Sequence, residues 1–324
     1  MIRSTLTTLF RAYKKNLMSC SLVFIPAHGF FSGAHIQSLV DSLNSLGIAP
    51  ISPATPTPQM RDFTVTVETP PSFTQITALH AILVPGRIDV LIRDAARARP
   101  KLLIADMDST ILQDETLDAI AAEIGIGDEV AAITARAMRG ELDFRAALAA
   151  RLNLIAGTPD SVLEKIWRGA RPSPGAGTLI KTLRAQGVTC VLVSGGFTYF
   201  TEHCAHLLGF DHYVGNTLTR KDGLITADLT LPLIDSHAKR KLAQDYAQKL
   251  GITMDQVMAI GDGANDLPLL QAVGYGIAYH PKPILREHIL NQILYGDLTA
   301  ALYAVGIDPT LFHAVPEPLP AELP

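Results

Sequence analysis

The sequence has little cysteine, and its cysteines form no pairing pattern. Cys20, Cys190 and Cys204 are an odd number, and no Cys-x-x-Cys pair occurs among the 324 residues. Disulfide scaffolds and zinc ribbons depend on cysteines at paired spacings, so both kinds of site are disfavoured. A reducing compartment, the cytoplasm, is therefore the expected location.

Long hydrophobic runs and an excess of basic residues are also missing. The longest apolar stretches, such as residues 21–25 and 188–193, have the length of a strand. They fall well short of the ~18 residues of a membrane span. The formal net charge of −4 gives no case for a nucleic-acid or lipid surface. With 48% hydrophobic and 18% charged residues the chain is too apolar to be disordered. We expect a folded protein that binds neither nucleic acid nor a membrane.

The length predicts more than one domain, because one domain typically has ~150 residues. Composition and periodicity divide the chain into a disordered extension at 1–18, a small α+β domain at 19–85, a linker or charged helix at 86–100, an α/β core at 101–300 and a proline-rich tail at 301–324. Within the α+β domain, the patterns predict strands at 19–26 and 63–68 and an amphipathic helix at 33–46.

The fourth segment alternates strands and helices. Apolar runs at 101–105, 188–193 and 257–260 are typical of buried strands, and helical periodicity follows each of them. This alternation predicts a parallel sheet with helices on both faces. Between the first two of these strands, residues 116–170 are strongly helical, which predicts a helical insertion.

Two acids directly follow the first strand of this core. Asp106 and Asp108 are two residues apart, so in an extended segment their side chains point the same way. Ligands of open α/β sheets bind beyond the carboxyl ends of the strands. Two adjacent carboxylates repel each other, and holding them there needs a cation or different protonation states. On its own, Asp-x-Asp fits an Asx-rich turn equally well.

Two further polar sets also follow strands, and a lysine in a basic run completes the pattern. Asp262 and Asp266 follow the last strand in a glycine-rich turn, whereas Ser194 and Gly195 follow the second strand, where a hydroxyl and free amides suit an anion. Lys239 lies in a basic run. Each set alone has a simpler interpretation as a helix cap, a glycine turn or a solvated charge run. Together they indicate an oxygen-ligated Mg²⁺ beside a phosphate, and hence metal-assisted phosphoryl transfer.

These segments, in this order, resemble the four motifs of the haloacid dehalogenase superfamily. The motifs are Asp106-Met107-Asp108-Ser109-Thr110, Ser194-Gly195-Gly196, Lys239 and Gly261-Asp262-Gly263-Ala264-Asn265-Asp266. They are most similar to those of superfamily members that hydrolyse O-phospho-L-serine to L-serine and phosphate, the last step of serine biosynthesis. The resemblance covers about residues 100–295 and implies a Rossmann-like sheet with the helical insertion as a cap. A looser one relates residues 1–85 to amino-acid-sensing regulatory domains.

The resemblance implies roles for the acidic residues. Asp106 is the expected nucleophile, which forms an aspartyl-phosphate, and Asp108 is the expected general acid and base. Magnesium is expected between the Asp106 carboxylate, the Asp108 backbone carbonyl and the Asp262 carboxylate. Asp266 is expected to orient Lys239 or a metal-bound water.

The same resemblance implies how a substrate is held. The groups expected on the phosphoryl oxygens are Lys239, the Ser194 hydroxyl and the Gly195 amide, with Asn265 on substrate or phosphate. From the cap, Glu115 is expected on the substrate ammonium and Arg151 on its carboxylate, a planar group that suits an arginine fork. Met138 and Phe144 match apolar cap positions over the site.

Other functions compete with this interpretation. A related phosphatase acting on another small phosphomonoester fits the same motifs, although Glu115 and Arg151 are both present. A non-catalytic, ligand-sensing regulator is disfavoured because Asp106, Asp108 and Lys239 are retained. The sequence leaves open whether the protein is a homodimer and which ligand, if any, the first 85 residues bind.

Overall fold

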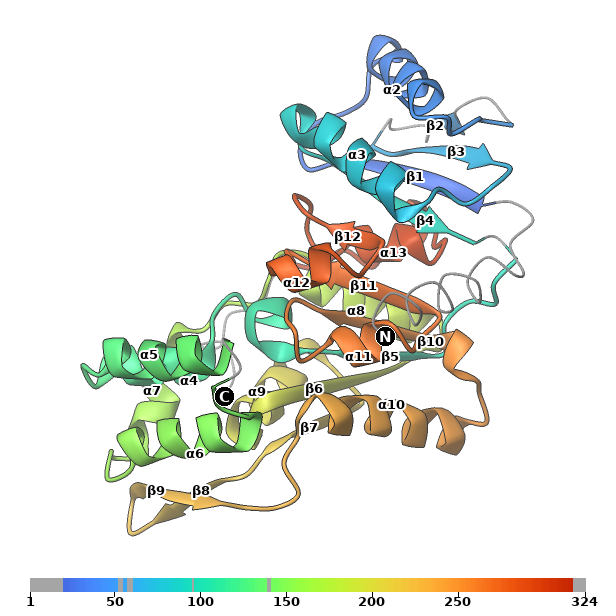
Figure 1. Cartoon of the computed structure of the whole chain (residues 1–324). Coiled ribbons are helices and arrows are strands. Elements are labelled where there is room, and N and C mark those ends of the chain that lie inside the picture. Colours follow the sequence, from blue (N-terminus) through green and yellow to red (C-terminus); the bar gives the residue numbers. More distant parts are fainter. Residues whose placement is uncertain (1–19, 52–54, 57–60, 95, 139–140, 317–324) are drawn as a thin grey trace, which may run out of the picture. The chain divides into compact units, whose positions relative to one another are not determined.

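The computed structural model describes residues 20–51, 55–56, 61–94, 96–138 and 141–316 (Figure 1). Its contacts divide the chain into two units. Unit 1 comprises Met1–Arg99 and Ile277–Leu311, and unit 2 comprises Pro100–Gly276 and Phe312–Pro324. The extension predicted at 1–18 lies outside the described residues. Within them, no helix has the length and apolarity to cross a membrane.

Unit 1 contains an antiparallel sheet with the strand order β2-β3-β1-β4. Its strands are β1 (Cys20–Pro26), β2 (Thr55–Pro56), β3 (Phe63–Val67) and β4 (Ile88–Arg93). Helices α2 (Gly33–Ser45) and α3 (Phe73–Leu83) each begin at a capping box, formed by Ser32 and Ser72. Apolar side chains of these helices pack with alternate strand residues such as Phe24 and Phe63. The strands and the helix predicted over 19–68 are confirmed.

The predicted linker at 86–100 is wrong over residues 88–93. These residues form β4, which pairs with β1 along its whole length. Val90, Leu91 and Ile92 are all buried. The arginines at both ends suggested a solvated segment, yet three consecutive buried side chains place the strand in the core of unit 1.

The predicted proline-rich tail is also wrong at its beginning. Residues 300–304 form helix α13 (Ala300–Ala304), and Ala301 and Leu302 are fully buried in unit 1. The remaining elements of this part of the chain are β11 (Tyr275–Tyr279), α12 (Pro283–Arg286), β12 (Asn291–Ile293), which pairs in parallel with β11, and the short turn η4 (Pro309–Leu311). Residues 317–324 lie outside the described residues.

Unit 2 contains four neighbouring strands of a parallel sheet in the order β10-β5-β6-β7. They are β5 (Leu102–Ala105), β6 (Thr189–Phe197), β7 (His212–Asn216) and β10 (Val257–Gly261). Helices α8 (Ala176–Ala185) and α9 (Thr198–Leu208) pack on β6, α10 (Ser236–Leu250) on β5, and α11 (Leu267–Leu270) on β10. β5 and β10 are buried at every residue, as expected of parallel strands covered on both faces. The predicted α/β parallel sheet is confirmed.

Residues between β5 and β6 form the helical insertion that the sequence predicts. It consists of α4 (Thr116–Glu123), α5 (Gly127–Met138), α6 (Phe144–Ile155) and α7 (Ser161–Gly169). α4 packs on α5 and α7, and α5 packs on α6. An antiparallel hairpin of β8 (Leu218–Lys221) and β9 (Leu224–Leu229) lies along α6 in Figure 1. The insertion is therefore extended by a segment that is distant in the sequence.

Parallel pairing brings the predicted motifs to one edge of the sheet. Ala105, at the end of β5, pairs with Ile260 on one side and Leu192 on the other. The backbone amide of Asp106 then donates to the Ile260 carbonyl at 2.9 Å. The residues that follow β5, β6 and β10 consequently meet beyond the same carboxyl edge.

Candidate active site

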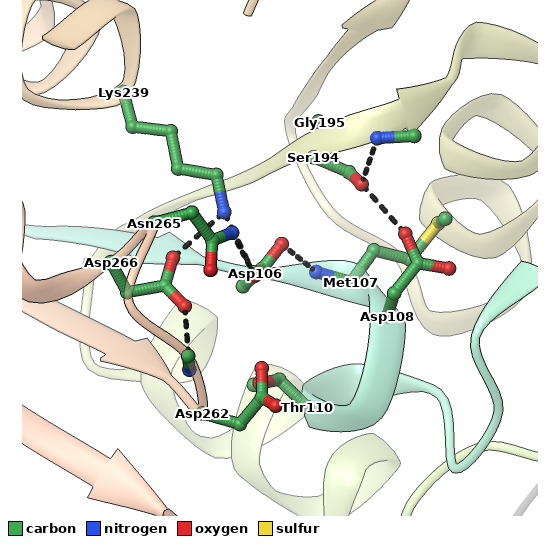
Figure 2. A network of polar contacts seen from close by, with 12 residues as sticks. Asp106, Met107, Asp108, Thr110, Ser194, Gly195, Lys239, Asp262, Asn265 and Asp266 are labelled. Carbon is green, nitrogen blue, oxygen red and sulfur yellow. Dashed lines mark hydrogen bonds and ion pairs between the residues drawn. The ribbon is translucent and has the colours of Figure 1, made fainter. Parts of the chain in front are cut away.

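Asp106 has a fixed orientation, because each carboxylate oxygen is held by a donor (Figure 2). Oδ1 accepts a hydrogen bond from the Met107 amide at 2.7 Å. Oδ2 lies 2.8 Å from Lys239 Nζ and accepts from Asn265 Nδ2 at 3.2 Å. The side chain is 5% exposed. A buried carboxylate that is held in one orientation beside an ammonium is suited to nucleophilic attack on phosphorus.

The carboxylate of Asp108 has different partners from that of Asp106. Its Oδ1 accepts from the Thr116 amide at 2.9 Å, and its Oδ2 accepts from Ser194 Oγ at 2.9 Å. Both acids follow the end of β5, as the sequence predicts, and each carboxylate has its own hydrogen-bond donors. Within the turn η2 (Met107–Ile111), Asp108 has extended backbone angles (φ −64°, ψ 133°), and the chain changes direction at Ser109, which has a φ of 55°.

Asp108 is also set apart by its protonation equilibrium. Burial raises its pKa to about 6, the charges of Asp106 and Glu115 act in the same direction, and the amide of Thr116 opposes them. The neutral and ionised forms are therefore both accessible near neutral pH. This is the property that a group needs in order to give and take a proton within one reaction.

Three buried acids form a group that could hold a metal ion. One carboxylate oxygen from each of Asp106, Asp262 and Asp266 lies within 4.8 Å of the others. Thr110 Oγ1 donates to Asp262 at 3.3 Å. Three carboxylates this close repel one another, and an all-oxygen donor set suits Mg²⁺. The residues present thus fit a divalent cation. The Asp108 carboxylate is not part of this group, so the metal role predicted for Asp108 rests on its backbone carbonyl alone.

Lys239 reaches the site from the first turn of α10. Asp235 caps that helix by accepting from the Ala238 amide at 2.8 Å. The Lys239 Nζ lies 2.7 Å from Asp266 Oδ1, and the lysine side chain is 1% exposed. Burial disfavours its charge, yet Asp106 and Asp266 together raise its pKa above the ordinary value. The site therefore contains a fixed, permanently charged ammonium at neutral pH.

Ser194 and the following glycines lie in the irregular end of β6, directly before helix α9. The pairing of β6 with β7 shifts in register between Val193 and Phe197, and α9 begins at Thr198. Ser194 Oγ accepts from the Gly196 amide at 2.8 Å. A Cβ atom at Gly196 would lie 2.7 Å from Asp108 Oδ2, so any larger residue would displace that acid.

The cap contributes side chains beside this edge. Glu115, the N-cap residue of α4, is exposed and its Oε1 accepts from Ser109 Oγ at 3.0 Å. The ring of Phe144 lies against Gly195, with Cζ 3.4 Å from the position of a Cβ on that glycine. Met138 is the last residue of α5, and its side chain is not among those that the structure describes.

Arg151 is a half-buried residue of α6. Its Nε donates to the Ala147 carbonyl at 3.3 Å. Burial lowers the pKa of its guanidinium, whereas the charges of Asp118, Glu115 and Asp108 raise it. Arg151 is thus within electrostatic range of the acids of the site while it belongs to the cap.

Three residues that contact the site were not predicted as site residues from the sequence. Thr110 donates to Asp262, the Thr116 amide donates to Asp108, and Asn216 contacts Gly195 and Ile234. Thr110 and Thr116 were detectable, because they stand within or just after the first motif. Asn216 carried a weaker signal, namely a polar residue at the carboxyl end of a strand.

The family profile of haloacid dehalogenase-like hydrolases matches residues 103–271, more than half of the chain. The chain belongs to this family. The match spans Asp106, Asp108, Ser194, Lys239, Asp262 and Asp266, which are the residues that the fold brings together.

One curated relative and two solved structures show which members of this family the chain resembles. A phosphoserine phosphatase from Streptomyces coelicolor is 42% identical over 241 residues, which cover 74% of this chain and 58% of that protein. The chain thus spans little more than half the length of this curated relative. A HAD family hydrolase from Salmonella enterica superposes with a TM-score of 0.80 at 29% identity, over 89% of this chain and 99% of that one. A phosphoserine phosphatase solved as an analogue of its phospho-aspartyl intermediate gives 0.60 at 36% identity, over 64% and 99% of the two chains.

Proposed function

We propose that the protein hydrolyses O-phospho-L-serine to L-serine and phosphate. The observation that carries the proposal is the buried Asp106 beside Lys239, with the protonatable Asp108 turned toward Ser194. Membership of the hydrolase family and similarity to phosphoserine phosphatases support it. A role in serine biosynthesis and a cytoplasmic location belong to the same proposal.

In the proposed reaction Asp106 is the nucleophile and Asp108 is the general acid and base. A carboxylate oxygen of Asp106 attacks phosphorus, the bond from phosphorus to the serine oxygen breaks, and Asp108 protonates that oxygen as it leaves. Asp108, now ionised, takes a proton from water as the water attacks the aspartyl-phosphate. The bond to Asp106 breaks, phosphate is released, and both acids return to their initial states.

Other residues hold the charge of the phosphoryl group. Lys239, the Ser194 hydroxyl, the Gly195 amide and Asn265 bind its oxygens in the proposed complex. The carboxylates of Asp106 and Asp262 and the backbone carbonyl of Asp108 would hold Mg²⁺, which would supply positive charge that offsets two anions in one site. Asp266 holds Lys239 in place through the 2.7 Å contact between them.

Substrate choice is assigned to the cap. Glu115 binds the substrate ammonium and Arg151 its carboxylate, with apolar cover from Met138 and Phe144. The ring of Phe144 against Gly195 supports this, because it connects the cap directly to the loop that holds phosphate. The small domain at 19–85 is proposed to be regulatory, and a homodimer is compatible with the proposal.

A comparison of substrates tests the proposed function. Purified protein with Mg²⁺ is given phosphoserine, phosphothreonine, phosphoglycolate or an aryl phosphate, and released phosphate is measured. We expect the highest kcat/KM for phosphoserine. Equal kcat/KM values for all four substrates would contradict the proposed specificity for phosphoserine. They would favour a phosphatase that acts on another small phosphomonoester.

A further inference from the structure

Asn216 connects two parts of unit 2 that are far apart in the sequence. It ends β7, and its side chain is 3% exposed. Its Nδ2 donates to the Gly195 carbonyl at 2.7 Å, and its Oδ1 accepts from the Ile234 amide at 2.8 Å. One amide group therefore joins the end of β6 to the segment that leads into α10.

Both joined segments carry groups that face the candidate active site. Gly195 stands between Ser194, which donates to Asp108, and Gly196, whose amide donates to Ser194. Ile234 directly precedes Asp235, the cap of the helix that carries Lys239. The two segments are also in contact, because a Cβ at Gly195 would lie 3.4 Å from the Ile234 carbonyl oxygen.

We infer that Asn216 is a positioning residue, which sets the distance between the Ser194–Gly196 segment and the start of α10. This inference rests on the proposed function, because it assumes that both the Ser194–Gly196 segment and the start of α10 carry groups that bind the phosphate. This position requires a specific side chain, because the group at residue 216 must donate a hydrogen bond to Gly195 and accept one from Ile234. Aspartate can accept from Ile234 but would turn an oxygen toward the Gly195 carbonyl. Alanine leaves both backbone groups buried without this partner.

A residue that only stabilises the fold would give a different result, and the chain offers a matched control. Asn291 in unit 1 is also buried, and its amide joins the Ile92 carbonyl at 3.1 Å and the Ile92 amide at 2.7 Å. Asn291→Ala therefore removes the same pair of hydrogen bonds from a residue with no place in the proposed reaction. Its effect on melting temperature measures the structural cost alone.

The test compares wild type with Asn216→Ala, Asn216→Asp and Asn291→Ala at a temperature well below their melting transitions. The affinity for inorganic phosphate is measured by calorimetry with Mg²⁺, and kcat and KM are measured with an aryl phosphate. We expect both Asn216 variants to bind phosphate roughly tenfold more weakly and to lose on the order of 10–100-fold in kcat, since misplaced binding groups have effects of that size. Asn291→Ala is expected to match wild type in both.

Three outcomes would overturn the inference. These are phosphate affinity in Asn216→Ala equal to that of Asn291→Ala, full activity of Asn216→Asp, or no phosphate binding by the wild type. Weaker phosphate binding in the Asn216 variants, together with no turnover of phosphoserine by the wild type, supports the inference and counts only against the proposed substrate.

Discussion

The ammonium nitrogen of Lys239 lies 2.8 Å from the carboxylate of Asp106, and the two side chains are 1% and 5% exposed. The carboxylate of Asp266 also contacts the Lys239 ammonium, at 2.7 Å. Burial raises the pKa of Asp266, and repulsion from Asp106 adds to this effect. The site therefore concentrates charges that would be costly to bury separately, and a change in one of them is expected to affect the others.

Replacing Asp106, the proposed nucleophile, should separate activity from folding. In Asp106→Asn the amide has nearly the shape of the carboxylate but cannot attack phosphorus, and one of three repelling charges is removed. We expect phosphate release to fall at least ~1,000-fold, in keeping with the loss of a nucleophile, while the melting temperature stays near that of wild type. Asp245→Asn, at an exposed acid of α10, is the control. Substantial turnover by Asp106→Asn would exclude Asp106 as the nucleophile.

Magnesium should stabilise the folded protein as well as support turnover. Because Asp106, Asp262 and Asp266 lie close together, a bound cation relieves their repulsion. We expect added Mg²⁺ to raise the melting temperature and a chelator to abolish phosphate release reversibly. Asp262→Asn should reduce both responses. An equal rise in the variant would mean that the ion binds elsewhere.

Gly196 should tolerate no side chain. In Gly196→Ala the new methyl group would meet Asp108 Oδ2 at 2.7 Å and Ser194 Oγ at 3.1 Å. We expect kcat to fall on the order of 100-fold, as is typical when a reacting group is displaced by about 1 Å. Gly169→Ala, which meets no atom within 4 Å, is the control in the same unit. Wild-type kcat in Gly196→Ala would contradict the role of this close contact.

Arg151 should matter most for substrates with a carboxylate. We expect Arg151→Ala to lower kcat/KM for phosphoserine at least ~10-fold more than for an aryl phosphate, since an arginine–carboxylate pair contributes about 1.5–3 kcal/mol. Arg145→Ala, at an exposed residue of the same helix, controls for the loss of positive charge. Equal losses on both substrates would count against the assigned role.

His80 should make unit 1 sensitive to acid. Burial lowers its pKa to about 4, the nearby Arg286 adds to this effect, and a hydrogen bond with the backbone of Val90 opposes it. On acidification the unfolded chain takes up this proton first, at pH ~6.5. Stability from this residue is complete above that value and is lost as the pH falls toward 4, up to about 3 kcal/mol.

The check is urea unfolding between pH 7.5 and 4.5, read by a probe in unit 1. His80→Gln should show a weaker decline with acidification than wild type, whereas His28→Gln, at an exposed histidine, should not. Identical pH profiles for His80→Gln and wild type would refute the assignment.

Hydrophobic periodicity and short motifs in the sequence predicted the strands and helices whose formation depends mainly on neighbouring residues. An apolar run that ends in acids, as before Asp106 and Asp262, is sufficient to place a strand and the ligand edge beyond it. The hydrogen-bond partners of Asp108 were not predictable in this way, because the Thr116 amide and the Ser194 hydroxyl belong to other segments of the chain. Strand β4 and helix α13 were missed because arginines and prolines beside them suggested exposure, whereas their burial is decided by distant partners. The role of Asn216 depends entirely on such partners.

The hydrogen bond between Asn265 and Asp106 joins residues 159 positions apart. Such a contact cannot exist on a growing chain that lacks its second member. During synthesis Asp106, the proposed nucleophile, is therefore present well before Lys239 and Asn265, which contact its carboxylate. Onset of phosphate release would thus report the completed fold of unit 2, and a refolding assay could use turnover as its probe.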